Sequence, residues 1–334
     1  MTVLPDCAVV AGGGATAGAR YDERVTSRFI HALAAGTQTI RIRSASDLRA
    51  SRAAEEGAHT VEQAALAGLI ADGMGWAFAA GYEAALVRLD PEGMRGGVLG
   101  SLCATEEGGG HPRAIRTSLA PREGGFALSG QKSWVTLGDA ADVLLVVASV
   151  GEDSGGRNRL RVARVPSRRR GVTVSEAPAS PFVPEIAHAK ATFEDVAIHP
   201  HEILPGDGYG DVLKPFRTIE DVHVMVAILG WAIGVGRASH WPRSWLDEAL
   251  ALVVTFHAVS DEPPLAPETH VALAGAQSLA RRLLGEAAWS QCEEATAARW
   301  ERDRPLLEVA KGVRGARLEA AWRSMMGQAP GRGD

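Results

Sequence analysis

The segment from about residue 97 to residue 205 is patterned for short β-strands, and helical sequence flanks it on both sides. Apolar residues alternate or form short runs there, and turns separate the runs without intervening helices. The expected strands lie within 126–129, 141–147, 160–165, 171–174 and 189–196. Such spacing predicts an antiparallel barrel or sandwich of roughly a hundred residues. We therefore expect three domains: 1–96, helical with an irregular leader; 97–206, β; and 207–334, helical.

The flanking regions carry the apolar spacing of helices. From about residue 48 to 89 the chain is alanine-rich, with apolar side chains at three- and four-residue intervals, and Asp90 and Pro91 end the pattern. Helical sequence returns after Pro215. Its longest apolar run, from Val224 to Gly236, is too short to span a bilayer, so we expect a buried helix and no membrane span.

The composition is that of a soluble globular protein, with 46% apolar and 22% charged residues among 334. The net charge of −5 argues against a nucleic-acid partner. Three scattered cysteines without a C-x-x-C pair favour a reducing compartment over a disulfide scaffold or a zinc site. The cysteine pattern therefore leads us to expect no bound metal. Because the first residues lack a basic region followed by an apolar core, we expect no signal peptide and a cytoplasmic protein.

A glycine-rich stretch at residues 9–17 matches a G-x-G-x-x-A pattern that can place a pyrophosphate at a helix N-terminus. A second strand at 39–43 would then need an acidic residue at its end, where Arg43 and Ser44 stand. The parallel strands of a dinucleotide-binding sheet do not follow. A flexible or locally folded leader is therefore the favoured interpretation.

Two motifs in the β region carry most of the chemical information. Residues 105–110 read T-E-E-G-G-G and residues 130–136 read G-Q-K-S-W-V-T; F-E-D-V follows at 193–196. In this order and at this separation they resemble the middle domain of the acyl-CoA dehydrogenases, over about residues 95–240. The resemblance implies an α+β multidomain fold: an N-terminal helical domain, a middle antiparallel β-barrel and a truncated C-terminal helical bundle.

The resemblance also implies an FAD site on the β domain. Thr105 would donate toward the pyrimidine edge of the flavin, Trp134 would lie against the ring, Thr136 would approach N5 or O4, and Leu102 would belong to the same wall. An alternative from the residues alone stays open. Trp134 can be a core aromatic of the barrel, and the two threonines can be ordinary strand residues, since β-branched side chains favour strands.

Several positions depart from the family pattern. His111 and Pro112 replace the usual serine and aspartate after the first motif, which makes His111 a candidate substrate-binding residue in a changed setting. The R-x-x-F-G segment that reaches a neighbouring subunit's cofactor pyrophosphate is absent, although Arg243 lies in that region. The basic run at 168–170 either meets a CoA phosphate or forms a solvated turn.

In the acyl-CoA dehydrogenases that the chain resembles, a base removes the α-proton of the acyl thioester. That base is a carboxylate with a raised pKa in an apolar pocket. The C-terminal E-G-T position of most family members is missing here, and Glu220, at the start of the first helix after the β domain, matches the position used by a minority. A second interpretation makes Thr218 and Asp221 a capping box, with Glu220 complementing the helix dipole. His223 nearby is expected to be a packed or solvated residue.

The expected activity is FAD-dependent α,β-dehydrogenation of an acyl-CoA or acyl-carrier thioester by a shortened, divergent family member. An electron-transfer flavoprotein or oxygen would reoxidise the flavin, and a homodimer or larger homo-oligomer is expected. Two alternatives stay open. One is a non-catalytic paralogue that binds a partner or a thioester, and the other is an oxidase or monooxygenase on the same fold.

Overall fold

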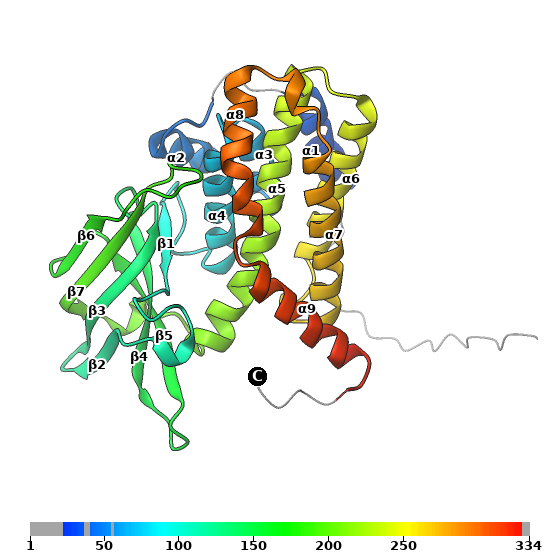
Figure 1. Ribbon diagram of the computed structural model, residues 1–334. Coiled ribbons are helices and arrows are strands. Elements are labelled where there is room, and N and C mark those ends of the chain that lie inside the picture. The colour runs from blue at the N-terminus through cyan, green and yellow to red at the C-terminus, as the bar shows by residue number, and fades with distance from the viewer. Residues whose placement is uncertain (1–22, 37–40, 55–56, 329–334) are drawn as a thin grey trace, which may run out of the picture.

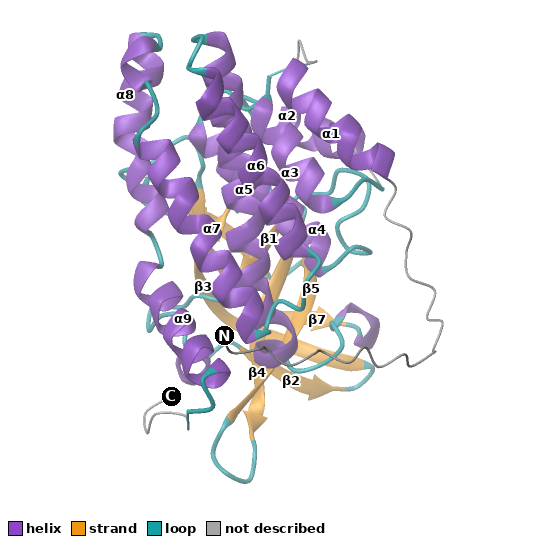
Figure 2. Ribbon diagram, turned by 90° about the vertical axis from the view of Figure 1, so that its right-hand side faces the viewer, coloured by secondary structure: helices purple, strands orange, loops and turns teal. Residues whose placement is uncertain are grey.

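The computed structural model describes residues 23–36, 41–54 and 57–328, and the glycine-rich stretch at 9–17 lies outside them. Helices and strands occupy separate sides of the molecule, with α4 nearest the sheet (Figure 1). Figure 2 shows the strands beneath most of the helices. The expected order of a helical domain, a β domain and a second helical domain is confirmed.

Four helices precede the sheet: α1 (Glu23–Ala35), α2 (Ala45–Ala54), α3 (Thr60–Leu69) and α4 (Met74–Leu89). Small residues let α3 and α4 press against α5 (Lys214–Ala238). A Cβ at Gly68 would lie 2.0 Å from the backbone oxygen of Ala227, and one at Gly230 would lie 2.2 Å from the oxygen of Ala65. The alanine-rich pattern of the sequence is thus the packing surface of three closely spaced helices.

The central helix begins earlier than the sequence indicates. A π-helical segment, η3 (Gly208–Leu213), runs directly into α5, and the Asp207 side chain accepts hydrogen bonds from the N–H groups of Tyr209 and Gly210 at 3.1 and 2.6 Å. Asp207 is therefore the cap. The expected capping box at Thr218 and Asp221 is wrong, because both residues lie inside α5.

Among the described helices, the continuous segment Gly208–Ala238 is long and apolar enough to cross a membrane by length and composition alone. However, 67% of its most apolar window is buried inside the protein. It contains the run from Val224 to Gly236, and α3, α4, α6 and α7 pack around it, as expected for a buried core helix.

The β domain is a curled half-barrel. Its strands are β1 (Gly100–Cys103), β2 (Ser118–Arg122), β3 (Gly125–Thr136), β4 (Val143–Glu152), β5 (Asn158–Pro166), β6 (Val172–Glu176) and β7 (His188–Ile198). The order is β1-β4-β2-β3-β7-β6, with β5 paired to β4. The five expected strand segments are confirmed. The expectation of a purely antiparallel barrel needs correction, because β4 pairs in parallel with β1 and β2.

The last domain contains α6 (Arg243–Ser260), α7 (Pro267–Gly285), α8 (Glu294–Asp303) and α9 (Lys311–Met325). The 3₁₀ segments η4 (Trp289–Gln291) and η5 (Arg304–Glu308) connect α7, α8 and α9. Trp231 stacks near Trp289, and Trp289 stacks on Trp300 with ring centroids 4.3 Å apart. These buried rings fix α8 against α5, while α9 packs against α7 at the lower right of Figure 1.

Candidate functional site

The two sequence motifs lie side by side. The N–H of Ser133 donates to the carbonyl oxygen of Thr105 at 2.8 Å, and the buried ammonium of Lys132 is 2.7 Å from Glu106. Glu106 also accepts from the N–H groups of Arg116 and Thr117 at 2.7 and 3.0 Å. Burial would raise the pKa of Glu106, but Lys132 and these donors hold it below its ordinary value. The ion pair therefore joins the motifs into one wall.

Trp134 projects from this wall instead of entering the core. It sits at a bulge where the β3–β7 register shifts between Lys132 and Val135, and its φ is +57°. The side chain is 57% exposed, whereas Val135 beside it is fully buried. A left-handed backbone conformation at a large aromatic residue raises the free energy of the folded state, and such strain is typical of functional sites. The alternative of a core aromatic is wrong for Trp134.

His188 lies beside Trp134, although no motif in the sequence includes it. It pairs with Thr136 in the β3–β7 register and meets the Trp134 ring edge-on at 5.7 Å between centroids. Its Nδ1 is buried without a hydrogen-bond partner. Burial lowers its pKa, which favours the neutral ring. An exposed indole beside an unsatisfied buried nitrogen fits a planar heteroaromatic group that brings its own polar atoms.

The first motif is linked to α5 through Tyr82. The N–H of Leu102 donates to the Tyr82 hydroxyl at 2.7 Å, and the Tyr82 ring packs edge-on against Phe216 with centroids 6.0 Å apart. Phe216 and Glu220 are four residues apart on α5 and so share one helix face. Glu220 is therefore near the Tyr82 and Phe216 rings, which link α5 to strand β1.

Glu220 lines a small apolar cavity of about 140 Å³ between α4, α5 and the η5–α9 connection. Phe78, Met225 and Leu307 are among the apolar walls. Within the described chain the carboxyl group has no hydrogen-bond or ion-pair partner. Burial raises the pKa of Glu220 to about 8, and the negative charge of Asp221 adds to that shift. A carboxylate in this setting is suited to accept a proton.

The negative charge of Asp221 is compensated by α9. Arg314 and Arg317 of α9 both pair with its carboxylate, the Arg314 contact at 3.4 Å. His223 is a packed residue, as expected: its Nδ1 is 2.7 Å from the Ile219 oxygen and its Nε2 is 2.9 Å from the Thr60 hydroxyl. Burial lowers the His223 pKa to about 4, so the ring is neutral.

The remaining sequence candidates lie at the edge of the β domain. His111 is exposed and caps a 3₁₀ turn, η1 (Pro112–Ala114), where its Nδ1 accepts from the N–H of Arg113 at 3.2 Å. Its role toward a substrate stays a prediction. Arg169 of the basic run forms a bidentate pair with Glu202, so it is neither a free solvated residue nor a free phosphate ligand.

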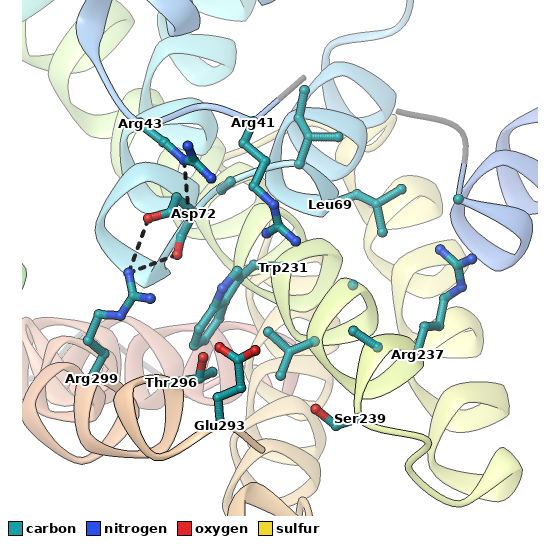
Figure 3. Close-up of a pocket in the computed structure, with 16 residues that line it drawn as sticks. Arg41, Arg43, Leu69, Asp72, Trp231, Arg237, Ser239, Glu293, Thr296 and Arg299 are labelled. Carbon is teal, nitrogen blue, oxygen red and sulfur yellow. Dashed lines mark hydrogen bonds and ion pairs between the residues drawn. The ribbon is translucent and has the colours of Figure 1, made fainter. Parts of the chain in front are cut away.

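A basic cavity of about 550 Å³ lies where α3, α5 and α8 meet (Figure 3). Arg43 and Arg299 both contact Asp72, at 3.3 and 3.2 Å. Arg237 donates to the carbonyl oxygen of Ala35, and Arg41 points into the cavity, where it has no partner among the described residues. Four arginines thus face two carboxylates, Asp72 and Glu293, and the surplus positive charge suits an anion.

Comparisons with known proteins agree with this architecture. Residues 101–196 match the family model "Acyl-CoA dehydrogenase, middle domain". Benzylmalonyl-CoA dehydrogenase of Aromatoleum aromaticum is 27% identical over 156 residues, covering 46% of this chain and 39% of the relative. Dibenzothiophene monooxygenase of Rhodococcus erythropolis is 24% identical over 195 residues, covering 53% and 45%. The chain thus matches less than half the length of these relatives.

Among solved structures, FMN-bound TdsC of Paenibacillus sp. A11-2 superposes with a TM-score of 0.64 at 18% identity. The match covers 91% of this chain and 96% of that one, so the similarity in fold extends through all three domains. The architecture and the linked motifs define a helical–β–helical protein of the acyl-CoA dehydrogenase type. Residues 101–196 thus match the middle domain of the acyl-CoA dehydrogenase family, and the chain as a whole shares the fold of these proteins.

Proposed function

We propose that the protein is a flavin-dependent oxidoreductase that dehydrogenates an acyl thioester between its α and β carbons. The observation that carries the proposal is Glu220, whose carboxyl group lines a mainly apolar cavity between α4, α5 and the η5–α9 connection and has no ion-pair partner among the described residues. The exposed Trp134 and the unsatisfied Nδ1 of His188 supply a wall for the flavin. We take the flavin to be FAD and the oligomer to be a homodimer.

The residues divide the chemistry between them. When bound, the flavin accepts hydride from the β carbon. The Trp134 indole would cover one side of the flavin ring and exclude water there, and Leu102, Thr105 and Thr136, on and beside strands β1 and β3, would border it. Glu220 accepts the α-proton at its carboxylate. Its apolar surroundings make the charged form costly, which makes it a strong base once ionised. His111 would contact the thioester substrate.

Arg314 and Arg317 compensate the negative charge of Asp221, the residue next to the proposed base. They bind Asp221 and thereby tie α9 to α5 beside the Glu220 cavity. Asp221 still raises the pKa of Glu220 through its negative charge. The arrangement fixes the helix turn that carries Glu220, and the positive charges of Arg217 and Arg314 only partly offset the rise in the Glu220 pKa that burial causes.

The visible spectrum of purified protein tests the flavin, and anaerobic titration with acyl-CoA tests the reaction. We expect bound flavin that bleaches on addition of the thioester and retains its absorbance in Glu220→Gln. Colourless protein that cannot be reconstituted with FAD or FMN would overturn the proposal and favour a non-catalytic paralogue. Bleaching at an unchanged rate in Glu220→Gln would exclude Glu220 as the base.

A monooxygenase or oxidase is the second candidate. Its supporting observations are the similarity to dibenzothiophene monooxygenase and the 57% exposure of Trp134, which leaves that edge of the wall open to solvent. Oxygen uptake by the reduced protein distinguishes the candidates. Fast uptake favours oxygen as acceptor, whereas slow uptake with rapid reduction of an added electron-transfer flavoprotein favours the dehydrogenase. We also propose that the protein acts in the cytoplasm.

A further inference from the structure

A cluster of two histidines and two carboxylates joins α3 to the last turn of α6, on elements that do not line the Glu220 cavity. His59 precedes α3 and Glu62 lies in its first turn, while His257 and Asp261 come from the end of α6. The His59 and His257 rings stack with centroids 4.2 Å apart and planes at 23°. Residues nearly two hundred positions apart therefore present imidazole and carboxylate groups to one another.

The distances between the donor atoms suit one metal ion. His59 Nε2 is 3.3 Å from one Asp261 oxygen, and His257 Nδ1 is 3.8 Å from the other. One donor atom from each of the three residues lies within 4.8 Å of the others. Two ligand atoms bound tetrahedrally at 2.0–2.1 Å are about 3.4 Å apart, which is close to the observed separations. Because the stacked rings point their lone pairs along nearly parallel planes, one imidazole must rotate about its side-chain bonds to complete the site.

We propose that His59, His257 and Asp261 bind a divalent transition-metal ion of the Zn²⁺ class, with water completing the coordination. Imidazole and carboxylate ligands together suit zinc and its neighbours better than magnesium or calcium, which prefer all-oxygen sites. The site departs from our sequence-based expectation of no metal. That expectation rested on cysteine spacing, which cannot reveal a histidine–aspartate site assembled from distant helices.

Glu62 strengthens the assignment. Its Oε1 is 3.5 Å from His257 Nε2, the ring nitrogen that is not directed at Asp261, and both side chains are only 9% exposed. A metal-bound histidine usually donates its other N–H to a carboxylate, which fixes the tautomer and raises the basicity of the ligand. Glu62 is placed for that task. The cluster thus contains a supporting carboxylate as well as three ligands.

One local contact changes on binding. His59 Nδ1 accepts a long bond, 3.3 Å, from the N–H of Val61, and coordination through Nε2 would put the remaining proton on Nδ1 and end that bond.

Isothermal titration of tag-free, EDTA-dialysed protein with ZnCl₂ tests the site. We expect one saturable ion per chain and a rise in Tm that follows zinc concentration. His59→Ala and Asp261→Asn, which change partly exposed positions, are each expected to weaken binding at least tenfold. Co²⁺ in place of Zn²⁺ should give the intense visible absorption of a tetrahedral ion in the unaltered protein only.

His201→Ala is the matched control, because it removes an exposed histidine that stacks on His199 elsewhere in the chain. It should leave zinc affinity unchanged. Circular dichroism of each apo variant checks that it is folded. Equal zinc affinity in the unaltered protein, His59→Ala and Asp261→Asn, or the absence of saturable binding in the unaltered protein, would overturn the proposal. Neither result depends on flavin or on acyl-thioester turnover.

Discussion

Glu220 and Asp221 are neighbours on α5 and line the same cavity, but within the described chain only Asp221 forms ion pairs there. Asp221 is held by two arginines of α9, whereas Glu220 lies against Phe78, Met225 and other apolar side chains. Adjacent helix positions are separated by about 100° around the axis, so two carboxylates in succession can have different surroundings. One carboxylate fixes α9, and the other is free to exchange a proton.

The pH dependence of thioester oxidation should report Glu220. Since the folded-state pKa is raised to about 8, the ionised base becomes more abundant as pH rises through 8. We expect kcat/KM to increase with pH to a plateau above 8, and Glu220→Gln to lower it by at least a hundredfold, about 2.7 kcal/mol, at every pH. Glu319→Gln, an exposed change on α9, is the control. A profile that is flat between pH 6 and 9 would contradict this role.

The same group should influence stability in the opposite direction. A pKa that is higher in the folded state than in the unfolded chain stabilises the fold at low pH, and that contribution is lost as pH rises from about 4.5 through about 8. Urea unfolding of the apo protein at several pH values should therefore show a decline across that range. The decline should be smaller in Glu220→Gln, and an identical pH slope in both proteins would speak against a raised pKa.

Asp221→Asn should affect stability more than proton transfer. The substitution removes the charge that Arg314 and Arg317 share, and hydrogen bonds to charged groups typically contribute about 2 kcal/mol. We expect a loss of that size in the free energy of unfolding. Removing the neighbouring negative charge should also shift the kinetic pKa downward. A shift upward, or an unchanged profile with unchanged stability, would show that Asp221 does not act as described.

Trp134→Ala separates a cofactor wall from an ordinary surface residue. Because the side chain is 57% exposed, its removal should change the free energy of unfolding of the apo protein by no more than about 0.5 kcal/mol. Flavin affinity should fall by at least tenfold if the ring packs on the indole. Trp322→Ala removes another exposed tryptophan, 46% accessible, on α9. Equal flavin affinity in both variants would exclude Trp134 from the site.

The sequence predicted elements whose evidence is local and missed relationships that depend on distant pairing. Alternating residues located the strands, but they could not show that β4 pairs in parallel with β1. Thr218 is of a residue type that commonly caps helices. The helix nevertheless begins earlier, at Asp207, because the π-helical segment Gly208–Leu213 runs into α5 just before Pro215. His188 carried no motif at all. Its place beside Trp134 follows from the β3–β7 register, which only the folded chain defines.

Lys132→Met should destabilise the β domain where its two sequence motifs meet. It leaves Glu106 in place with its two backbone donors but without its cationic partner, and breaking a buried pair in this way typically costs about 3 kcal/mol. Lys190→Met, an exposed change on β7, is the matched control. Chemical denaturation of the apo proteins provides the measurement. If both variants lose the same small amount, the ion pair does not stabilise the junction of the motifs.

The basic cavity offers a test of FAD against FMN. FAD carries a pyrophosphate and an adenosine that FMN lacks, and Arg41 and Arg237 are the cavity arginines without a carboxylate partner. If the cavity binds the pyrophosphate, within one chain or from a neighbouring copy, Arg41→Ala with Arg237→Ala should weaken FAD at least tenfold. The same double variant should change FMN affinity far less, because we propose that the flavin ring binds to the β domain beside Trp134. Arg122→Ala, on an exposed β2 position, controls for the general loss of positive charge. Equal weakening of FAD and FMN would contradict a pyrophosphate role for the cavity, and unchanged FAD affinity would remove the cavity from the flavin site altogether.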